Sequence, residues 1–270
     1  MKEFYYRLGK LPAEEDPWDR NIKFARILKA LPAIPKEYNG LAGIDFPTPV
    51  FGNDTWSNCV TVAKAHHTRW FELYEQGKLI DITDAEVLNQ YWDEGSLGCK
   101  LLRRIKKPDN GLILLESLKS WRKNGWIAGG QKLDIWAFDQ ANQLDKEEMQ
   151  AVLYLLGGAN IGVLLPNTAK QQFENGEPWD PYGSGWDSTP GSWGGHGIWL
   201  PPVYDYDTTL CVTWGKFQVV TWDFLFKYCD EYYGVADNRD RFLENSPVDV
   251  EKFDSYLKEI TRRRQYDTRR

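Results

Sequence analysis

The sequence is poor in the residues that build metal sites and disulfide frameworks. Its 270 residues include only four cysteines and three histidines. No two cysteines form a Cys-x-x-Cys pair, so we expect neither a structural zinc site nor a dense disulfide framework. Free thiols in a reducing compartment are the expectation, with Cys211 and Cys229 in the core.

Long apolar runs are also missing. No stretch approaches the roughly 18 uncharged apolar residues that a membrane helix requires. The first residues, 1–7, lack the apolar run of a signal peptide. We therefore expect a soluble, cytoplasmic protein with no signal peptide and no membrane partner.

Positive charge is in the minority. The 33 Lys and Arg residues are outnumbered by 39 Asp and Glu residues, which gives a net charge of −6 and argues against nucleic acid as a partner. We interpret the basic run at residues 100–107 as solvated surface. The terminal run at residues 261–270 is either frayed in solvent or in contact with an acidic partner. The Gly/Trp-rich stretch 179–195 lacks the Gly-Lys-Ser/Thr of a phosphate-binding loop.

Aromatic residues are abundant, and their periodicity indicates the order of elements. The 13 tryptophans predict a large packed core or a groove lined by rings. Helical spacing comes first in the chain and strand-like alternation follows, which predicts an α+β fold of two packed lobes with an antiparallel sheet. Helices are expected at 57–76, from 83, at 111–121, at 146–156 and from 221; strands are expected at 132–138, 161–165, 197–204, 210–214, 217–220 and 232–235.

The domain is expected to span residues 45–236. Its helical lobe would run to about residue 130, and its β-rich lobe would occupy 131–236. Residues 1–44 are punctuated by prolines around one amphipathic piece, so we expect an extension strapped onto the domain. Residues 237–270 predict an amphipathic helical tail.

One cysteine is placed for chemistry. A loop of turn-forming residues, Gly-Asn-Asp-Thr-Trp-Ser-Asn at 52–58, leads to Cys59 and then to a helix. Unpaired N–H groups at a helix start favour a thiolate. A single downstream histidine, His196, lies in the segment Gly-Gly-His-Gly-Ile. The other two histidines, His66 and His67, follow Cys59 on its own helix, and we expect packing or solvation for them rather than a ligand role.

These features resemble the papain-like cysteine peptidase superfamily over residues 45–236. The 137 residues between Cys59 and His196 agree with the roughly 130–150 typical of papain-type pairs. The resemblance implies that Cys59 is the nucleophile and His196 its base. It also implies that the N–H of Cys59 and the amide of Asn53, which stands where the family has Gln, stabilise the oxyanion. No cofactor is implied.

A closer resemblance is to a group of bacterial and phage proteins with papain-like folds. The shared motifs are the Gly-Asn-x-x-x-x-x-Cys loop at 52–59, Trp-Gly-Gly-His at 193–196 and Thr-Trp-Gly at 213–215. Thr-Trp-x-Phe at 221–224 and Tyr-x-Asp-Glu at 228–231 complete the set. The order of the five motifs indicates the fold. Candidates for the walls of a substrate groove are Trp56, Trp186, Trp193 and Trp214, with core packing as the alternative.

The third member of the family's triad is missing. Val212 stands where the family has Asn, and valine cannot orient an imidazole. A shift of one residue in strand register would present Thr213 instead. Asp205 and Asp207 could substitute only if the chain bent sharply at the prolines before them.

Two functions remain open at this point. One is a cysteine hydrolase that uses a Cys59–His196 dyad on a peptide or related acyl bond. The other is an inactive papain-fold protein that binds neighbouring structural subunits through its terminal extensions, plausibly in a phage virion. A groove plugged by the chain itself would favour the second.

Overall fold

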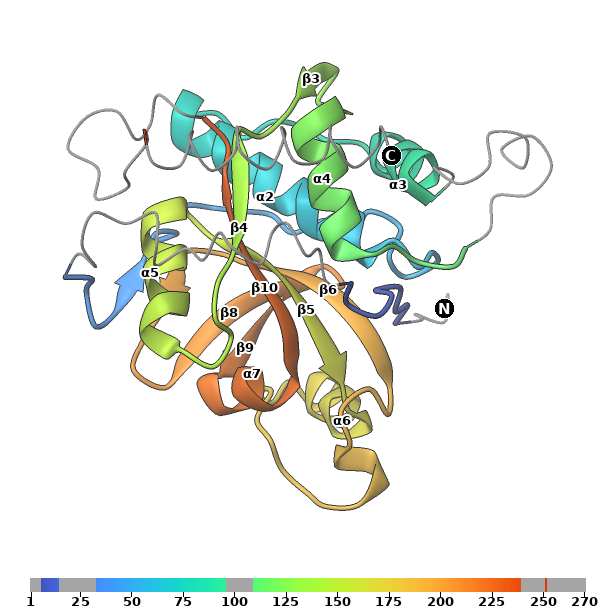
Figure 1. Cartoon of the computed structure of the whole chain (residues 1–270), viewed down its shortest axis with the longest axis vertical. Helices are drawn as coiled ribbons and strands as arrows, with labels where there is room; N and C mark the ends of the chain where they lie inside the picture. The colour runs from blue at the N-terminus through green and yellow to red at the C-terminus, as the bar shows by residue number, and fades with distance from the viewer. Residues whose placement is uncertain (1–5, 15–32, 96–108, 239–250, 252–270) are drawn as a thin grey trace, which may run out of the picture.

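The structure, a computed structural model, describes residues 6–14, 33–95, 109–238 and 251. It has the mixed α+β architecture expected, with one group of helices above a largely antiparallel sheet and the other helices beside and below it (Figure 1). The helices are α2 (Cys59–Gln76), α3 (Asp84–Gly95), α4 (Leu114–Asn124), α5 (Lys146–Leu156), α6 (Asn167–Asn175), α7 (Trp222–Tyr228) and the 3-10 turn η3 (Trp186–Ser188).

The main sheet has the strand order β1-β7-β8-β6-β5-β10-β4, with β9 paired to β8. The strand pairings described for this sheet are antiparallel. A separate hairpin, β2–β3, belongs to the helical lobe. The strands are β1 (Tyr38–Asn39), β2 (Trp126–Ala128), β3 (Gln131–Leu133), β4 (Ala137–Gln140), β5 (Ala159–Leu165), β6 (Gly194–Leu200), β7 (Val203–Tyr204), β8 (Thr208–Thr213), β9 (Lys216–Thr221) and β10 (Cys229–Ala236).

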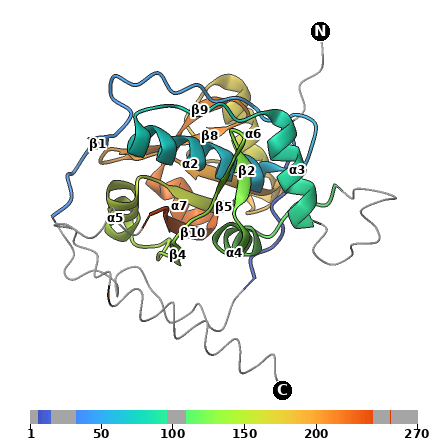
Figure 2. The same ribbon diagram turned by 90° about the horizontal axis from the view of Figure 1, so that it is seen from above.

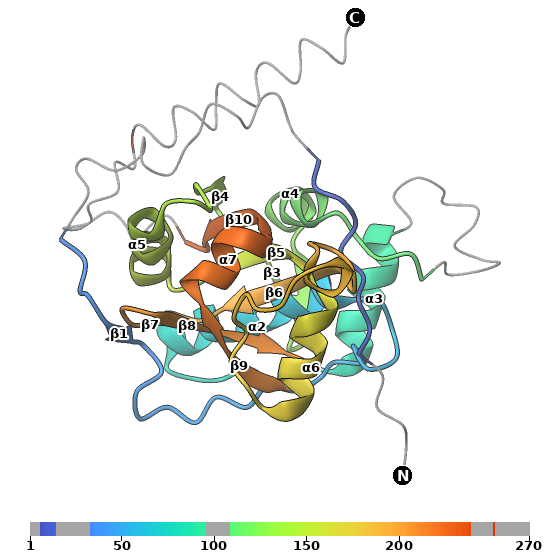
Figure 3. The same ribbon diagram turned by 90° about the horizontal axis from the view of Figure 1, so that it is seen from below.

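The sheet separates two hydrophobic cores. Because successive strand residues point to opposite faces, Trp199 packs with α2, α3 and α4 while its neighbour Ile198 packs with α5, α6 and α7. Figure 2 shows α2 lying across one face of the sheet, and Figure 3 shows α7 and α6 on the opposite side. The helical lobe (α2–α4 with β2–β3) and the β-rich lobe therefore meet along α2.

Most predicted elements are confirmed, and local signals explain their ends. Helix α5 begins where Asp145 accepts a hydrogen bond from Glu148 N–H, and α7 begins where Thr221 accepts one from Phe224 N–H. Both side chains satisfy N–H groups that a helix start leaves unpaired.

Two predicted strands are wrong in extent. The strand expected at 132–138 is two strands, because the chain crosses between lobes there: β3 pairs with β2, whereas β4 pairs with β10. The strand expected at 197–204 is broken into β6 and β7 at residues 201–202, where two prolines have no N–H to donate to a ladder. The amphipathic pieces predicted near residues 22–28 and in the tail, and the basic runs at 100–107 and 261–270, lie outside the described residues.

Candidate active site

Cys59 is the first residue of a helix that is buried along most of its length. Every residue from Cys59 to Glu72 is buried. The preceding Asn58 does not cap the helix with its side chain but donates from Nδ2 to the Phe51 carbonyl, at 2.9 Å. Phe51 and Gly52 both have positive φ, 53° and 76°, a strained arrangement for the phenylalanine. The loop is thus tied down so that the cysteine is presented at the boundary of the two lobes.

A missing side chain lets this helix touch the strand that carries His196. A Cβ on Gly197 would lie 2.9 Å from Val60 Cγ2 and 3.1 Å from Val60 Cα, so no larger residue fits between α2 and β6. The Gly197 N–H donates to Cys59 Sγ at 3.3 Å. The sulfur therefore contacts the residue that follows His196.

The His196 ring is held on one edge and one face. Its Nε2 lies 2.7 Å from Thr213 Oγ1, and its ring stacks on Trp214 with centroids 4.3 Å apart and planes 12° apart. Its Nδ1 is buried and has no hydrogen-bond partner within the described part of the chain. No hydrogen bond joins His196 to Cys59 there, so one ring nitrogen is anchored while the other is unengaged.

Strand alternation explains why Thr213, and not Val212, reaches the histidine. Val212 pairs with Trp199 and packs in the helical-lobe core. Its neighbour Thr213 points to the other face. The strand then reverses through Trp214 and Gly215, both at positive φ (42° and 78°), which is typical of a two-residue hairpin turn. This strained turn lays the indole of Trp214 on His196.

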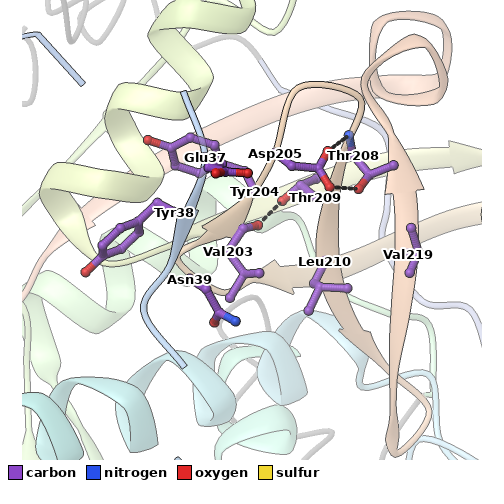
Figure 4. Close-up of a pocket in the computed structure, with 10 residues that line it drawn as sticks. All are labelled: Glu37, Tyr38, Asn39, Val203, Tyr204, Asp205, Thr208, Thr209, Leu210 and Val219. Atoms are coloured by element: carbon purple, nitrogen blue, oxygen red, sulfur yellow. Dashed lines mark hydrogen bonds between the residues drawn. The ribbon is translucent and has the colours of Figure 1, made fainter. Parts of the chain in front are cut away.

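The aspartates considered as substitutes lie elsewhere. Asp205 lies between β7 and β8, before β8 begins, whereas Thr213 is the last residue of β8. Asp205 Oδ1 accepts hydrogen bonds from the N–H groups of Asp207 and Thr208. It faces a separate hollow of about 430 Å³ at the edge of the sheet, lined from β1, β7, β8 and β9 (Figure 4). This hollow contains none of the candidate catalytic residues.

Burial dominates the electrostatics of the pair. It raises the pKa of the Cys59 thiol, against the opposing effect of N–H groups from Gly197, Gly9 and Val60. It lowers the pKa of His196 to about 3. The expectation of a thiolate favoured by the helix start is therefore wrong for this arrangement, because the thiol has lost more hydration than three N–H groups replace. At neutral pH both groups are uncharged.

A segment of the chain itself lies over the candidate pair. Residues 6–14, which we call the covering segment, lie between the helical lobe and the sheet (dark blue in Figures 1 and 3). Backbone hydrogen bonds tie the segment to both lobes: Arg7 N–H to Asn53 O (3.3 Å), Leu11 N–H to Leu112 O (2.9 Å), Leu112 N–H to Gly9 O (2.8 Å) and Lys10 N–H to Gly195 O (3.1 Å).

Glycines make this close approach possible. A Cβ on Gly9 would lie 2.0 Å from the Ser57 carbonyl oxygen, and one on Gly195 would lie 2.3 Å from the Lys10 carbonyl oxygen. At Gly111, on the other side, a Cβ would lie 2.0 Å from the Gly9 carbonyl oxygen. These contacts are impossible for any side chain, so the segment fits only while all three positions lack one.

Asn53 binds the covering segment through its amide. Its Nδ2 donates to the carbonyl of Arg7 at 3.3 Å and to that of Trp56 at 3.1 Å. The indole N–H of Trp214 donates to the same Arg7 carbonyl at 3.2 Å. A peptide carbonyl thus already sits between two side-chain donors.

The four tryptophans proposed as groove walls divide into two pairs. Trp193 and Trp214 pack on each other and on Tyr6 of the covering segment, with centroids 5.2–6.2 Å apart. Trp186 is 73% exposed, and Trp56 packs edge-on against Trp92 in the helical lobe. Of these four, Trp214 stacks on His196, and both Trp193 and Trp214 contact Tyr6 of the covering segment.

Both histidines on α2 pack inside the protein. His66 contacts Phe51 and Trp199, and His67 Nδ1 lies 2.7 Å from Asn160 Nδ2. Within the described ranges, no group of three or more His, Cys, Asp or Glu residues could hold a metal ion, and no helix is both long and apolar enough to cross a membrane.

Sequence reasoning missed how the covering segment is anchored. Lys10 is buried and its Nζ lies 2.7 Å from Asp230 Oδ2 and 2.9 Å from Glu231 Oε2. The Tyr-x-Asp-Glu motif pointed to these carboxylates, but nothing in the sequence linked them to a lysine more than 200 residues earlier. The sequence predicted an N-terminal extension packed on the domain, but not the residues that it contacts.

Comparison with solved structures identifies the fold. No family model and no curated protein sequence matches the chain. Among solved structures, xylellain, a cysteine protease from Xylella fastidiosa, is similar with a TM-score of 0.64 and 14% identity, over 88% of this chain and 99% of that one. A Carica candamarcensis cysteine protease has a TM-score of 0.52 and 14% identity, over 76% and 100%. Procathepsin L 3 of Tenebrio molitor has a TM-score of 0.53 and 8% identity, over 86% and 77%. The chain therefore has the papain-like cysteine protease fold.

Proposed function

We propose that the chain is a papain-like cysteine peptidase, held in a closed form by its covering segment. Cys59 is the nucleophile, His196 the base, Thr213 the residue that positions His196, and Asn53 an oxyanion donor. The observation that carries this proposal is the difference between the two ring nitrogens of His196. Its Nε2 is anchored to Thr213 at 2.7 Å, while its buried Nδ1 has no hydrogen-bond partner among the described residues, beside a cysteine whose sulfur contacts Gly197.

This anchoring determines which nitrogen of His196 carries a proton and which can accept one. With Nε2–H donating to the Thr213 hydroxyl, Nδ1 carries the lone pair that accepts the thiol proton. The sulfur then attacks a peptide carbonyl carbon, and the oxyanion is met by the Cys59 N–H and Asn53 Nδ2. Imidazolium returns the proton to the leaving amine, and water hydrolyses the thioester with the same histidine as base.

The covering segment supports a peptide as the ligand of this groove. It is itself a peptide, bound by backbone pairing to both lobes and by carbonyl contacts to Asn53 and Trp214. It meets the sulfur with the N–H of Gly9, so it blocks the thiol and withdraws water from it. Catalysis requires this segment to leave.

The covered groove also favours a second candidate. A papain-fold protein that never opens would serve as a binding or structural component, in a virion or another assembly, with its terminal segments docked on neighbouring subunits. The two candidates differ in what happens when the groove is opened.

A single substitution in the full chain opens the groove. Gly9→Leu places a side chain where even a Cβ would lie 2.0 Å from the Ser57 carbonyl oxygen, so the segment must withdraw. We expect this variant to cleave a mixture of internally quenched peptides at least about tenfold faster than wild type. Cys59→Ala in the same background should abolish cleavage without changing the circular dichroism spectrum.

Gly95→Ala is the matched control, because a Cβ there meets Leu112 Cδ2 at an ordinary 3.7 Å. It should leave activity unchanged. Turnover that survives Cys59→Ala, or no turnover by an opened and folded Gly9→Leu chain, would contradict the enzyme and favour the structural component.

A further inference from the structure

Two neighbouring carboxylates on β10 point into one pocket. In a regular strand Asp230 and Glu231 would face opposite sides of the sheet. The pairing of β10 with β5 shifts register between Cys229 and Glu231, as a β-bulge does, and a bulge can re-aim a side chain. As a result both carboxylates contact the same ammonium group, that of Lys10.

The pocket is built to the length of a lysine side chain. The Lys10 side chain is completely buried, and its Nζ lies 2.7 Å from Asp230, 2.9 Å from Glu231 and 3.2 Å from the Leu11 carbonyl oxygen. Its aliphatic stem lies on Gly162 of β5, where a Cβ would be only 2.0 Å from Lys10 Cε. A glycine at this point leaves the space that the stem fills.

The pocket is acidic, and Lys10 is the cation that it holds. Two carboxylates face one ammonium, and the Glu231 side chain is 1% exposed. Asp230 Oδ1 is buried and accepts no hydrogen bond from the described residues, whereas Glu231 Oε2 pairs with Lys10 and Glu231 Oε1 accepts from the Tyr233 hydroxyl. Burial raises the pKa of Glu231 and the charge of Lys10 opposes that rise, so a cationic occupant favours the ionised form of this pocket.

The pocket adjoins the candidate catalytic pair. Lys10 directly follows Gly9, whose N–H meets Cys59, and its own N–H donates to Gly195, the residue before His196. A side chain in the pocket therefore belongs to the residue next to the one at the thiol. When the covering segment withdraws, the carboxylates lose their cation beside the reacting bond.

We propose that Asp230 and Glu231 form a specificity subsite that takes a lysine side chain of the peptide substrate, with Lys10 occupying it in the closed form. This inference rests on the proposed function, because only a peptidase has a peptide substrate. Binding of a lysine-containing peptide, however, does not require turnover.

Binding tests the subsite without catalysis. The protein is the full chain with Gly9→Leu, Lys10→Ala and Cys59→Ala, so that its own lysine cannot compete. The probes are two fluorescent peptides, Arg-Leu-Gly-Lys-Leu-Pro-Ala and the same peptide with norleucine for lysine. Norleucine keeps the stem and lacks the ammonium. We expect the lysine peptide to bind at least about tenfold tighter, from its charge-assisted hydrogen bonds.

Substitutions then locate the preference. Glu231→Gln and Asp230→Asn should each reduce it, whereas Glu147→Gln, which removes an exposed carboxylate on α5, should not. Equal affinity for the two peptides in the unaltered pocket would overturn the proposal, even if the pocket variants failed to fold.

Turnover separates this proposal from the proposed function. With Cys59 intact, kcat/KM for quenched peptides should be highest with lysine at one position, and Glu231→Gln should remove that preference. Tight lysine-dependent binding without turnover would refute the peptidase and keep the subsite. Turnover indifferent to lysine would refute the subsite and keep the peptidase.

Discussion

At the scale of single residues, the site depends on which atoms of His196 are engaged. A hydroxyl takes the place that an amide has in the family that the chain resembles. Because Thr213 Oγ1 lies 2.7 Å from Nε2, one short side chain fixes both the ring orientation and the nitrogen left to act as a base. Trp214 adds a ring contact to the face of the imidazole.

Thr213 is therefore predicted to be a positioning residue. In the Gly9→Leu background, Thr213→Val keeps the shape of the side chain but leaves Nε2 buried and unpaired. We expect kcat/KM to fall at least about tenfold, equivalent to about 1.4 kcal/mol, with a changed pH profile. Thr213→Ser restores the hydroxyl and should recover both. Equal activity of the valine and serine variants would show that the hydrogen bond does not position the histidine.

The sequence predicted some of these residues and their contacts but not others. Cys59, His196 and Asn53 were predicted as candidates from motif order and spacing, both of which can be seen in the sequence alone. Thr213 was found because strand alternation leaves only one alternative to Val212. The contacts of Lys10 with Asp230 and Glu231 were not predictable, since they depend on a bulge and on long-range docking of the covering segment.

At the scale of elements, α2 is the helix on which the site depends. It lies between the two lobes and buries ionisable side chains, including His66 and Lys64, whose ammonium pairs with Glu94. Burial first, and then the charge of Arg69, lower the pKa of His66 to about 3. The helix thus carries a group that resists protonation while the protein is folded.

This burial predicts an acid sensitivity. In the unfolded chain His66 binds a proton below pH about 6.5, whereas in the folded chain it does so only below pH about 3. The free energy of unfolding therefore falls as pH falls between these two values. His66→Phe should make the decline shallower by about 1.4 kcal/mol per pH unit. Part of the decline should remain, because His196 behaves alike. Urea denaturation between pH 7 and 4 measures this; parallel declines in the two proteins would contradict it.

Element boundaries also show where sequence patterns fail. The break between β3 and β4 arises because the chain changes lobes, and alternation along a strand carries no information about the partner strand. Helix α5, by contrast, was predicted at its observed bounds, since Asp145 is a local capping signal.

At the scale of the whole molecule, two lobes meet at a groove that the chain fills with its own residues 6–14. Cys59 and His196 are both buried, and this burial is the main cause of both pKa shifts. Opening the groove should rehydrate the pair, lower the pKa of the thiol and allow His196 to accept its proton. We therefore expect these two residues to form an activated pair once the segment leaves.

The most direct test is the rate of Cys59 alkylation against pH in the full chain, followed by peptide mass spectrometry that distinguishes it from the other cysteines. We predict slow labelling of wild type and labelling of Gly9→Leu at least about tenfold faster near neutral pH. We also predict that His196→Ala removes this gain. Labelling of the opened chain that rises only at alkaline pH, and does not depend on His196, would contradict an activated Cys59–His196 pair.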